Sequence, residues 1–161
     1  NFEESSVISE DLRISYGSVS CEHDLGENAI PQEANLDKFA VSFTKGCYLG
    51  QELVCRIDSR EASTPFKYFA LEFSDKDAVV QAGDEILVGG EAVGEIKNEK
   101  SRVEEKKEEI IFGPFNAIAK ISRKGTASIL GNEQIGATAI RAQAKNFEAI
   151  RCEQVTGKFG V

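Results

Sequence analysis

The sequence lacks most of what metal sites and histidine-assisted cysteine chemistry need. It contains no Met, no Trp and a single histidine, His23. Its four cysteines, at positions 21, 47, 55 and 152, form neither a C-x-x-C pair nor a zinc-ligand spacing. Cys21 lies two residues from His23, but two ligands do not make a metal site. We therefore expect no metal site, and unpaired cysteines suit a reducing compartment: the cytoplasm, or the mitochondrial matrix in a eukaryote.

Long apolar runs and excess positive charge are also missing. No apolar run approaches the length that crosses a membrane, so we expect no membrane partner. Acidic residues outnumber basic ones by 27 to 19, for a formal net charge of −8. Phosphate binding needs clustered Lys and Arg, so this balance argues against nucleic acid as the main partner. A local basic pocket is still compatible with an acidic chain, and Lys45 with Arg56 can supply one.

The first sixty residues predict a mixed helical and irregular portion. The chain of 161 residues is 41% hydrophobic, which suffices for a real core. We expect one helix to end near Gly17, a short helical piece at residues 36–39, and another helix starting near Gly50, where apolar spacing becomes helical. Residues 59–65 are polar and end in proline, which is typical of a linker. The prediction is an α+β portion over residues 1–60, followed by a second unit over residues 61–161.

The second unit reads as a series of short strands. Phe69, Leu71 and Phe73 alternate as strand residues do, and Gly83-Asp84 marks a turn. Further strands are expected at residues 85–88 and 91–96, which form a hairpin around two glycines, and at 118–123, 127–130 and 137–142. The charged run 99–109 predicts a solvated loop or an exposed helix. Short strands with frequent glycine turns predict a small antiparallel β-barrel.

One segment, Lys45-Gly46-Cys47-Tyr48-Leu49-Gly50-Gln51-Glu52, has a composition that a core segment does not need. Its glycines permit unusual backbone angles and a close approach to the main chain. Cys47 lies just ahead of the expected helix and two residues from Lys45, and both features favour the thiolate. The alternative is an ordinary junction that contains a buried, inert cysteine.

The same octapeptide, K-G-C-Y-L-G-Q-E, resembles the signature of the YgfZ-type folate-binding proteins. These proteins share a superfamily with the aminomethyltransferase (T-protein, GcvT) of the glycine cleavage system. Similarity extends to about residue 140, through the segments 12–17, 30–36, 41–43, 93–96 and 115–119. The resemblance implies the C-terminal portion of a GcvT/YgfZ-like fold, in which residues 1–60 end the folate-binding domain and residues 61–161 form the barrel. It also implies that relatives carry a large N-terminal region with no counterpart here.

The resemblance points to tetrahydrofolate, or a folate derivative, as cofactor. The complete signature favours the YgfZ-type branch, which implies maturation or repair of iron–sulfur enzymes through the signature cysteine, with client iron–sulfur proteins as partners. Two alternatives stay open: a folate-dependent aminomethyltransferase like the T-protein, and a non-enzymatic protein-interaction module. Whether the chain is an enzyme is left undecided.

The resemblance also assigns roles to single residues. Cys47 and Lys45 are the candidate catalytic residues. Glu33 matches the glutamate that faces the pterin ring, whose adjacent N–H donors a carboxylate can accept in pairs. The other candidate cofactor-binding residues are Tyr48, Gln51, Glu52 and Arg56. Alternatives remain: Tyr48 as a core residue, and Glu52 as a helix cap or a partner of Lys45. Cys55 is expected to be a core residue.

Overall fold

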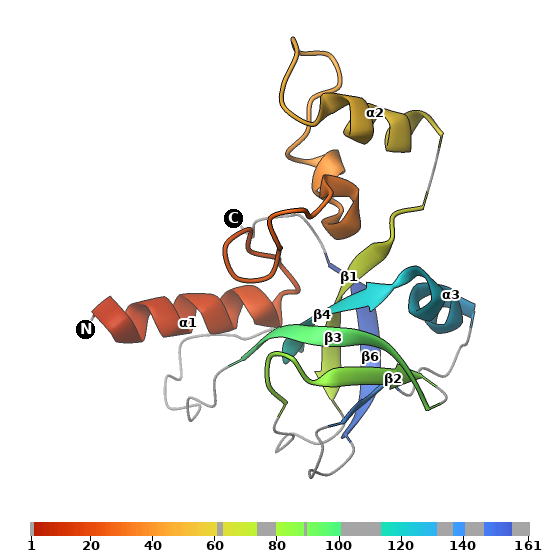
Figure 1. Ribbon diagram of the computed structural model, residues 1–161. Helices are drawn as coiled ribbons and strands as arrows, with labels where there is room; N and C mark the ends of the chain where they lie inside the picture. Colours follow the sequence, from red (N-terminus) through yellow and green to blue (C-terminus); the bar gives the residue numbers. More distant parts are fainter. Residues whose placement is uncertain are drawn as a thin grey trace.

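From Phe66 onward, the chain forms a closed antiparallel β-barrel (Figure 1). The computed structural model describes residues 2–60, 63–73, 80–88, 90–100, 114–131, 137–140 and 147–155. Among these, the strands are β1 (Phe66–Phe73), β2 (Glu85–Val88), β3 (Glu91–Glu99), β4 (Ala117–Ser122), β5 (Ala137–Ile140) and β6 (Phe147–Gln154). They close in the order β1-β4-β3-β2-β5-β6, and every neighbouring pair is antiparallel. The predicted α+β portion followed by a small antiparallel barrel is confirmed.

Helices occupy half of the first sixty residues. They are α1 (Phe2–Ser15), the 3₁₀ helices η1 (Pro31–Ala34) and η2 (Leu36–Lys38), and α2 (Gln51–Ser59); a further helix, α3 (Arg123–Gly131), follows β4. The predicted helix positions near Gly17, at 36–39 and after Gly50 are confirmed. None of the described helices is long and apolar enough to span a bilayer.

The end of α1 is fixed by a glycine. Gly17 has φ +68°, a left-handed conformation that other residues adopt only with strain. Its N–H donates to Ile14 O (2.9 Å) and the N–H of Ser18 donates to Arg13 O (3.1 Å), which is the hydrogen-bond pattern of a Schellman cap. A Cβ on Gly17 would lie 3.0 Å from the Cβ of Ala70, so the same glycine lets the chain approach β1 closely.

Strand β1 contributes to two hydrophobic clusters because its side chains alternate between two faces. Phe69, Leu71 and Phe73 pack in the cluster that contains residues of β2, β3 and β4, which is the barrel interior. Tyr68 and Ala70 pack in a second cluster with residues of α1 and η1. Each buried large apolar side chain stabilises a fold by roughly 1.5–3 kcal/mol. One face of β1 therefore stabilises the barrel interior, and the other face holds the N-terminal portion against the barrel.

The predicted strand at residues 127–130 is wrong, because these residues belong to α3. Helical spacing places Ile129 one turn after Gly125, and Ile129 is buried in the interior cluster. A Cβ on Gly125 would lie only 2.5 Å from the Cβ of Val93, so the helix packs very closely on the barrel. Alternation of Ala127 and Ile129 fits a strand equally well, and only this packing decides the outcome.

Other predicted boundaries differ in detail. The hairpin of β2 and β3 and the strand at 137–140 are confirmed, whereas Arg123 starts α3 instead of ending β4. Strand β6, which closes the barrel against β1, was not predicted from the sequence. In the charged run, Glu99 ends β3 and residues 101–109 lie outside the described part of the chain. The division at residues 60 and 61 stays a prediction.

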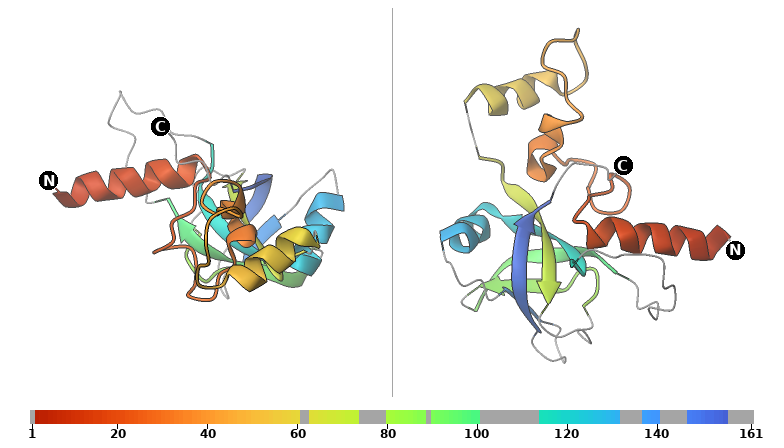
Figure 2. Two further views of the ribbon diagram at one scale, coloured as in Figure 1. Left: turned by 90° about the horizontal axis from the view of Figure 1, so that it is seen from above. Right: turned by 180° about the vertical axis from the view of Figure 1, so that it is seen from behind.

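Residues 41–59, the signature octapeptide with its flanks and α2, form an arm that stands away from the barrel (Figures 1 and 2). We call it the signature arm. Val54 is its buried residue within α2. Gln32 of η1 donates its Nε2 hydrogen to Val54 O (2.9 Å), so the arm is attached through η1, which lies between α2 and the barrel.

Candidate functional site

The signature segment forms a tight turn at the start of α2. Gly50 has φ +81° and occupies the position before the first helical residue, Gln51. The N–H of Tyr48 donates to the Gln51 side-chain oxygen (3.4 Å), and the N–H of Gln51 donates to Tyr48 O (3.2 Å). Gln51 therefore orders the turn from the first helical position. This local geometry explains why the glycine and the glutamine follow each other in the signature.

Cys47 lies exposed at this turn. The alternative interpretation, a buried core cysteine, is therefore wrong. The neighbouring Leu49 is fully exposed, and Phe43 and Leu53 of the same arm are exposed as well. A Cβ added to Gly46 or Gly50 would meet no atom within 4 Å. The thiol is thus presented on a projecting surface that also carries apolar side chains.

Lys45 is positioned by an aromatic ring. Its Nζ lies 4.8 Å from the centre of the Tyr48 ring, a cation–π contact worth roughly 0.5–1 kcal/mol at exposed sites. The Tyr48 hydroxyl is buried, and burial, with a smaller effect of the nearby Cys55 thiol, raises its pKa. Tyr48 is half-buried, so its ring packs at the turn while its face contacts the Lys45 ammonium.

Glu52 and Arg56 pair with each other. Arg56 Nη2 contacts Glu52 Oε1 one helical turn away, so the expected partner of Glu52, Lys45, is not the one that the structure shows. Both side chains are largely exposed, and such pairs contribute only about 0–1 kcal/mol. Cys55, expected in the core, is partly buried. Within the described residues, no group of three His, Cys, Asp or Glu is arranged to hold a metal ion.

Glu33 is buried in η1, with 3% of its surface exposed. Burial raises the pKa of its carboxyl, while the charges of Lys120 and Lys67 and backbone hydrogen bonds from Ile30 and Phe66 oppose that rise. The carboxyl therefore faces β1 and β4, the strands that carry these lysines. A buried carboxyl next to two ammonium groups is a site where a proton or a hydrogen-bond donor can be held.

The η1 segment is fastened on both sides. Lys67 Nζ donates to Gln32 O (2.7 Å), and Asn35 Nδ2 donates to Val155 O (2.9 Å). Two buried polar atoms beside it, Gln32 Oε1 and the Tyr68 hydroxyl, make no well-formed hydrogen bond within the described part of the chain. Neither Lys67 nor Tyr68 was predicted for this site, because a single lysine or tyrosine in a strand carries no distinctive local signal.

The structure groups the predicted site residues into two separate sets. Lys45, Cys47, Tyr48 and Gln51 share the turn of the signature arm, and Glu52 and Arg56 lie on the adjoining helix. Glu33 faces the barrel from η1, whereas the signature loop lies beyond α2 (Figure 1). The structure therefore does not bring Glu33 together with the signature turn.

The fold has a solved counterpart. The chain is similar to the crystal structure of glycine cleavage system aminomethyltransferase T from Bartonella henselae, with a TM-score of 0.60 and 15% identity. That match covers 87% of this chain and 36% of the other. The chain therefore has a YgfZ/GcvT-type fold, of which it spans about a third.

The chain is also similar in sequence to a protein of the YgfZ type. Over 58 residues, 35% of this chain, it is 43% identical to the tRNA-modifying protein YgfZ of Pectobacterium atrosepticum. The matched stretch covers 17% of that relative. No protein-family model matches the chain. The resemblance to the YgfZ/GcvT type, stated from the signature octapeptide, is confirmed at the level of the fold.

Proposed function

We propose that this chain is part of a tetrahydrofolate-binding protein that supports the maturation or repair of iron–sulfur enzymes. The observation that carries the proposal is the exposed thiol of Cys47, held on an intact signature turn in a YgfZ/GcvT-type fold. A structural cysteine is usually buried and inert, whereas a thiol that acts on a partner has to be accessible. Cys47 meets that requirement.

The surroundings of Cys47 indicate a macromolecular client. Exposed apolar side chains at Leu49 and Phe43 lie on the same arm, and the arm stands clear of the barrel (Figure 1). A small reactant is normally enclosed by its site, but a protein client brings its own surface to an exposed thiol. In this proposal Lys45 is the cation beside the thiol, and Arg56 is available for an anionic group.

Tetrahydrofolate is the proposed cofactor, with Glu33 as its pterin-binding carboxylate and Tyr48, Gln51, Glu52 and Arg56 as further contacts. The buried, lysine-flanked carboxyl of Glu33 has the chemistry to accept N–H donors. Because the described residues give only one wall, the 161-residue chain alone should bind tetrahydrofolate weakly or not at all. Micromolar binding by this chain in calorimetry would contradict that expectation.

The relative's name attaches it to tRNA modification. For this chain, whose net charge is −8, we propose an indirect link through a client enzyme that acts on tRNA. Salt-dependent binding of tRNA by the full-length protein would replace this indirect link with a direct one. The proposed compartment is a reducing one, which keeps the Cys47 thiol free.

Complementation tests the function. Cells that lack the full-length protein receive the wild type, Cys47→Ala, or the matched control Cys55→Ala, and iron–sulfur enzyme activities are compared with those of cluster-free enzymes. We expect Cys47→Ala to lose the rescue of iron–sulfur enzymes only, and Cys55→Ala to retain it. Full rescue by Cys47→Ala would refute the proposed role of the thiol.

The fold neighbour keeps a second candidate open, a folate-dependent aminomethyltransferase. Reconstitution of glycine cleavage with the remaining components discriminates, because robust turnover by the full-length protein would favour this enzyme. A pure interaction module is distinguished by titration of the full-length protein with tetrahydrofolate. Such a module should give no saturable signal.

A further inference from the structure

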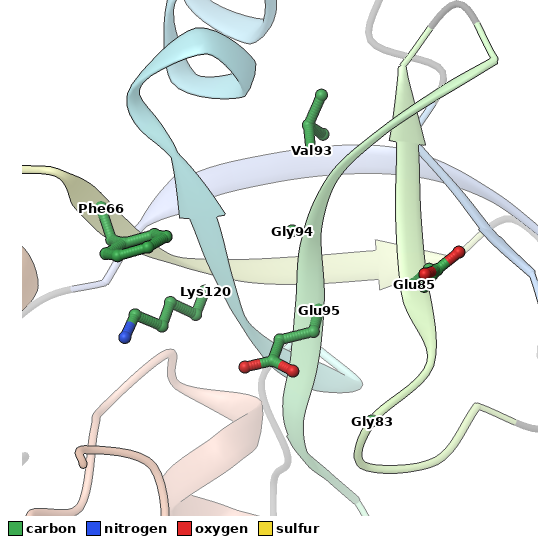
Figure 3. Close-up of a pocket in the computed structure, with 7 residues that line it drawn as sticks. All are labelled: Phe66, Gly83, Glu85, Val93, Gly94, Glu95 and Lys120. Carbon is green, nitrogen blue, oxygen red and sulfur yellow. The ribbon is translucent and has the colours of Figure 1, made fainter.

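A pocket of about 380 Å³ lies on the barrel wall formed by β4, β3 and β2, apart from the signature arm (Figure 3). Its volume falls within the range of small-molecule sites. Phe66 is its accessible apolar residue, whereas the side chain of Val93 is buried in the barrel interior. Its charged lining residues are Lys120, Glu95 and Glu85.

The order of these charges follows from the sheet register. Lys120 of β4 lies opposite Tyr68 of β1 on one side and opposite Glu95 of β3 on the other, and Glu95 lies opposite Glu85 of β2. Directly opposite residues of antiparallel strands project from the same face. The row therefore runs from an aromatic ring through a cation to two carboxylates. Like charges directly opposite each other destabilise a sheet, and at Glu95 this repulsion from Glu85 is offset in part by Lys97.

Lys120 and Glu95 are neighbours but do not pair. The Nζ of Lys120 lies 4.2 Å from the centre of the Phe66 ring, and Figure 3 shows the side chain running towards that ring. Glu95 instead pairs with Lys97 at 2.6 Å and keeps 47% of its side chain exposed. Among the described residues, neither Lys120 nor Glu85 makes an ion pair. One ammonium and two carboxylates thus remain accessible around a single pocket.

We propose that this pocket binds a small zwitterion, a free α-amino acid with an apolar side chain. Its carboxylate contacts Lys120, its ammonium contacts Glu95 and Glu85, and its side chain covers Phe66. Charge-assisted hydrogen bonds are the strong ones, and a ligand with both charges satisfies both sides of the row. A ligand with one charge leaves the opposite side unpaired. This inference is separate from the proposed role of the Cys47 thiol, but it shares Lys120 with the surroundings of Glu33.

Three matched probes test the pairing of charges: L-leucine, L-leucinamide, which lacks the carboxylate, and N-acetyl-L-leucine, which lacks the ammonium. Binding to the 161-residue chain is followed by NMR through the backbone amides of Gly94 and Glu95. We expect saturable shifts with leucine and about tenfold weaker binding of each single-charge probe, the loss that one charged contact typically causes. Equal affinities for the three probes, or no saturable shift with leucine, would overturn the proposal.

Two variants test the two ends separately. Lys120→Gln should weaken leucine about tenfold and leave leucinamide unchanged, and Glu95→Gln should weaken leucine and leucinamide but not N-acetyl-leucine. Lys124→Gln, which removes an exposed pairing with Glu91 beyond the pocket lining, is the matched control and should change nothing. Amide spectra report whether each variant folds, and either one suffices for the test. Unaltered leucine binding in a folded Lys120→Gln or Glu95→Gln variant contradicts the site.

Discussion

Replacing Cys47 by Ala should leave the free energy of unfolding nearly unchanged. The side chain is exposed, so its truncation removes no buried contact, and exposed substitutions change stability by less than about 0.5 kcal/mol. Val54 is the contrasting position, because it is buried where the signature arm meets η1. Val54→Ala deletes two methyl groups at about 0.8 kcal/mol each, and the cavity left behind brings the cost to about 2 kcal/mol.

The comparison is made by urea unfolding followed by far-ultraviolet circular dichroism. Equal slopes with a lower midpoint for Val54→Ala, and superimposable curves for Cys47→Ala and the wild type, are the expected result. Cys55→Ala, at a partly buried position, should fall between the two. A loss of more than about 1 kcal/mol in Cys47→Ala would mean that the thiol is a packing group, and the argument from its exposure would fail.

Two further pairs of variants test the electrostatics and the backbone. Burial raises the pKa of Glu33 above 4.5, so the folded state holds this proton more tightly, and the free energy of unfolding falls as pH rises from 4.5 through the raised pKa. Hydrogen bonding to Arg13 lowers the pKa of Glu10. The stabilisation from Glu10 is therefore present above pH 4.5 and is lost as pH falls through the lowered pKa. When the free energy of unfolding is measured against pH, Glu33→Gln should remove a decrease towards higher pH, and Glu10→Gln should remove a decrease towards lower pH. The same change in both variants would contradict these pKa directions. Gly17→Ala and Gly50→Ala both place a side chain at positive φ, at a cost of about 1–2 kcal/mol, but only Gly17 also meets Ala70. Thermal unfolding should show the larger drop in melting temperature for Gly17→Ala. Equal drops would mean that the surrounding structure shifts enough to relieve the contact with Ala70.

Local patterns allowed much of the fold to be predicted. The alternation in β1, the hairpin of β2 and β3 and the helix after Gly50 all depend on residues close together in the sequence. The change from strand to helix at Arg123 depends on the close packing of Gly125 against Val93, about thirty residues earlier, and a local sequence pattern cannot reveal such a long-range contact. Strand β6 was not predicted for a related reason, since one of its two partners, β1, lies far away in the sequence, although the other, β5, is the preceding strand.

The candidate site divides in the same way. The signature turn is built from residues adjacent in the sequence, so its composition alone is enough to single out Cys47, Tyr48 and Gln51. The environment of Glu33 is assembled from η1, β1 and β4, and the lysines that face its carboxyl come from two strands. Their meeting is a property of the sheet register, which sequence spacing alone does not determine.

Closure of the barrel makes its last strand matter for how the chain reaches this fold. In the register of β1 and β6, Phe69 pairs with Gln154, so the first strand of the barrel in chain order completes its pairing only with the last one. During synthesis, β1 therefore leaves the ribosome long before both of its edges can be paired. Unpaired edges are templates for aggregation, and contacts between distant residues slow folding. By pairing with both β1 and β5, residues 147–154 cover the two edges that the other five strands leave open.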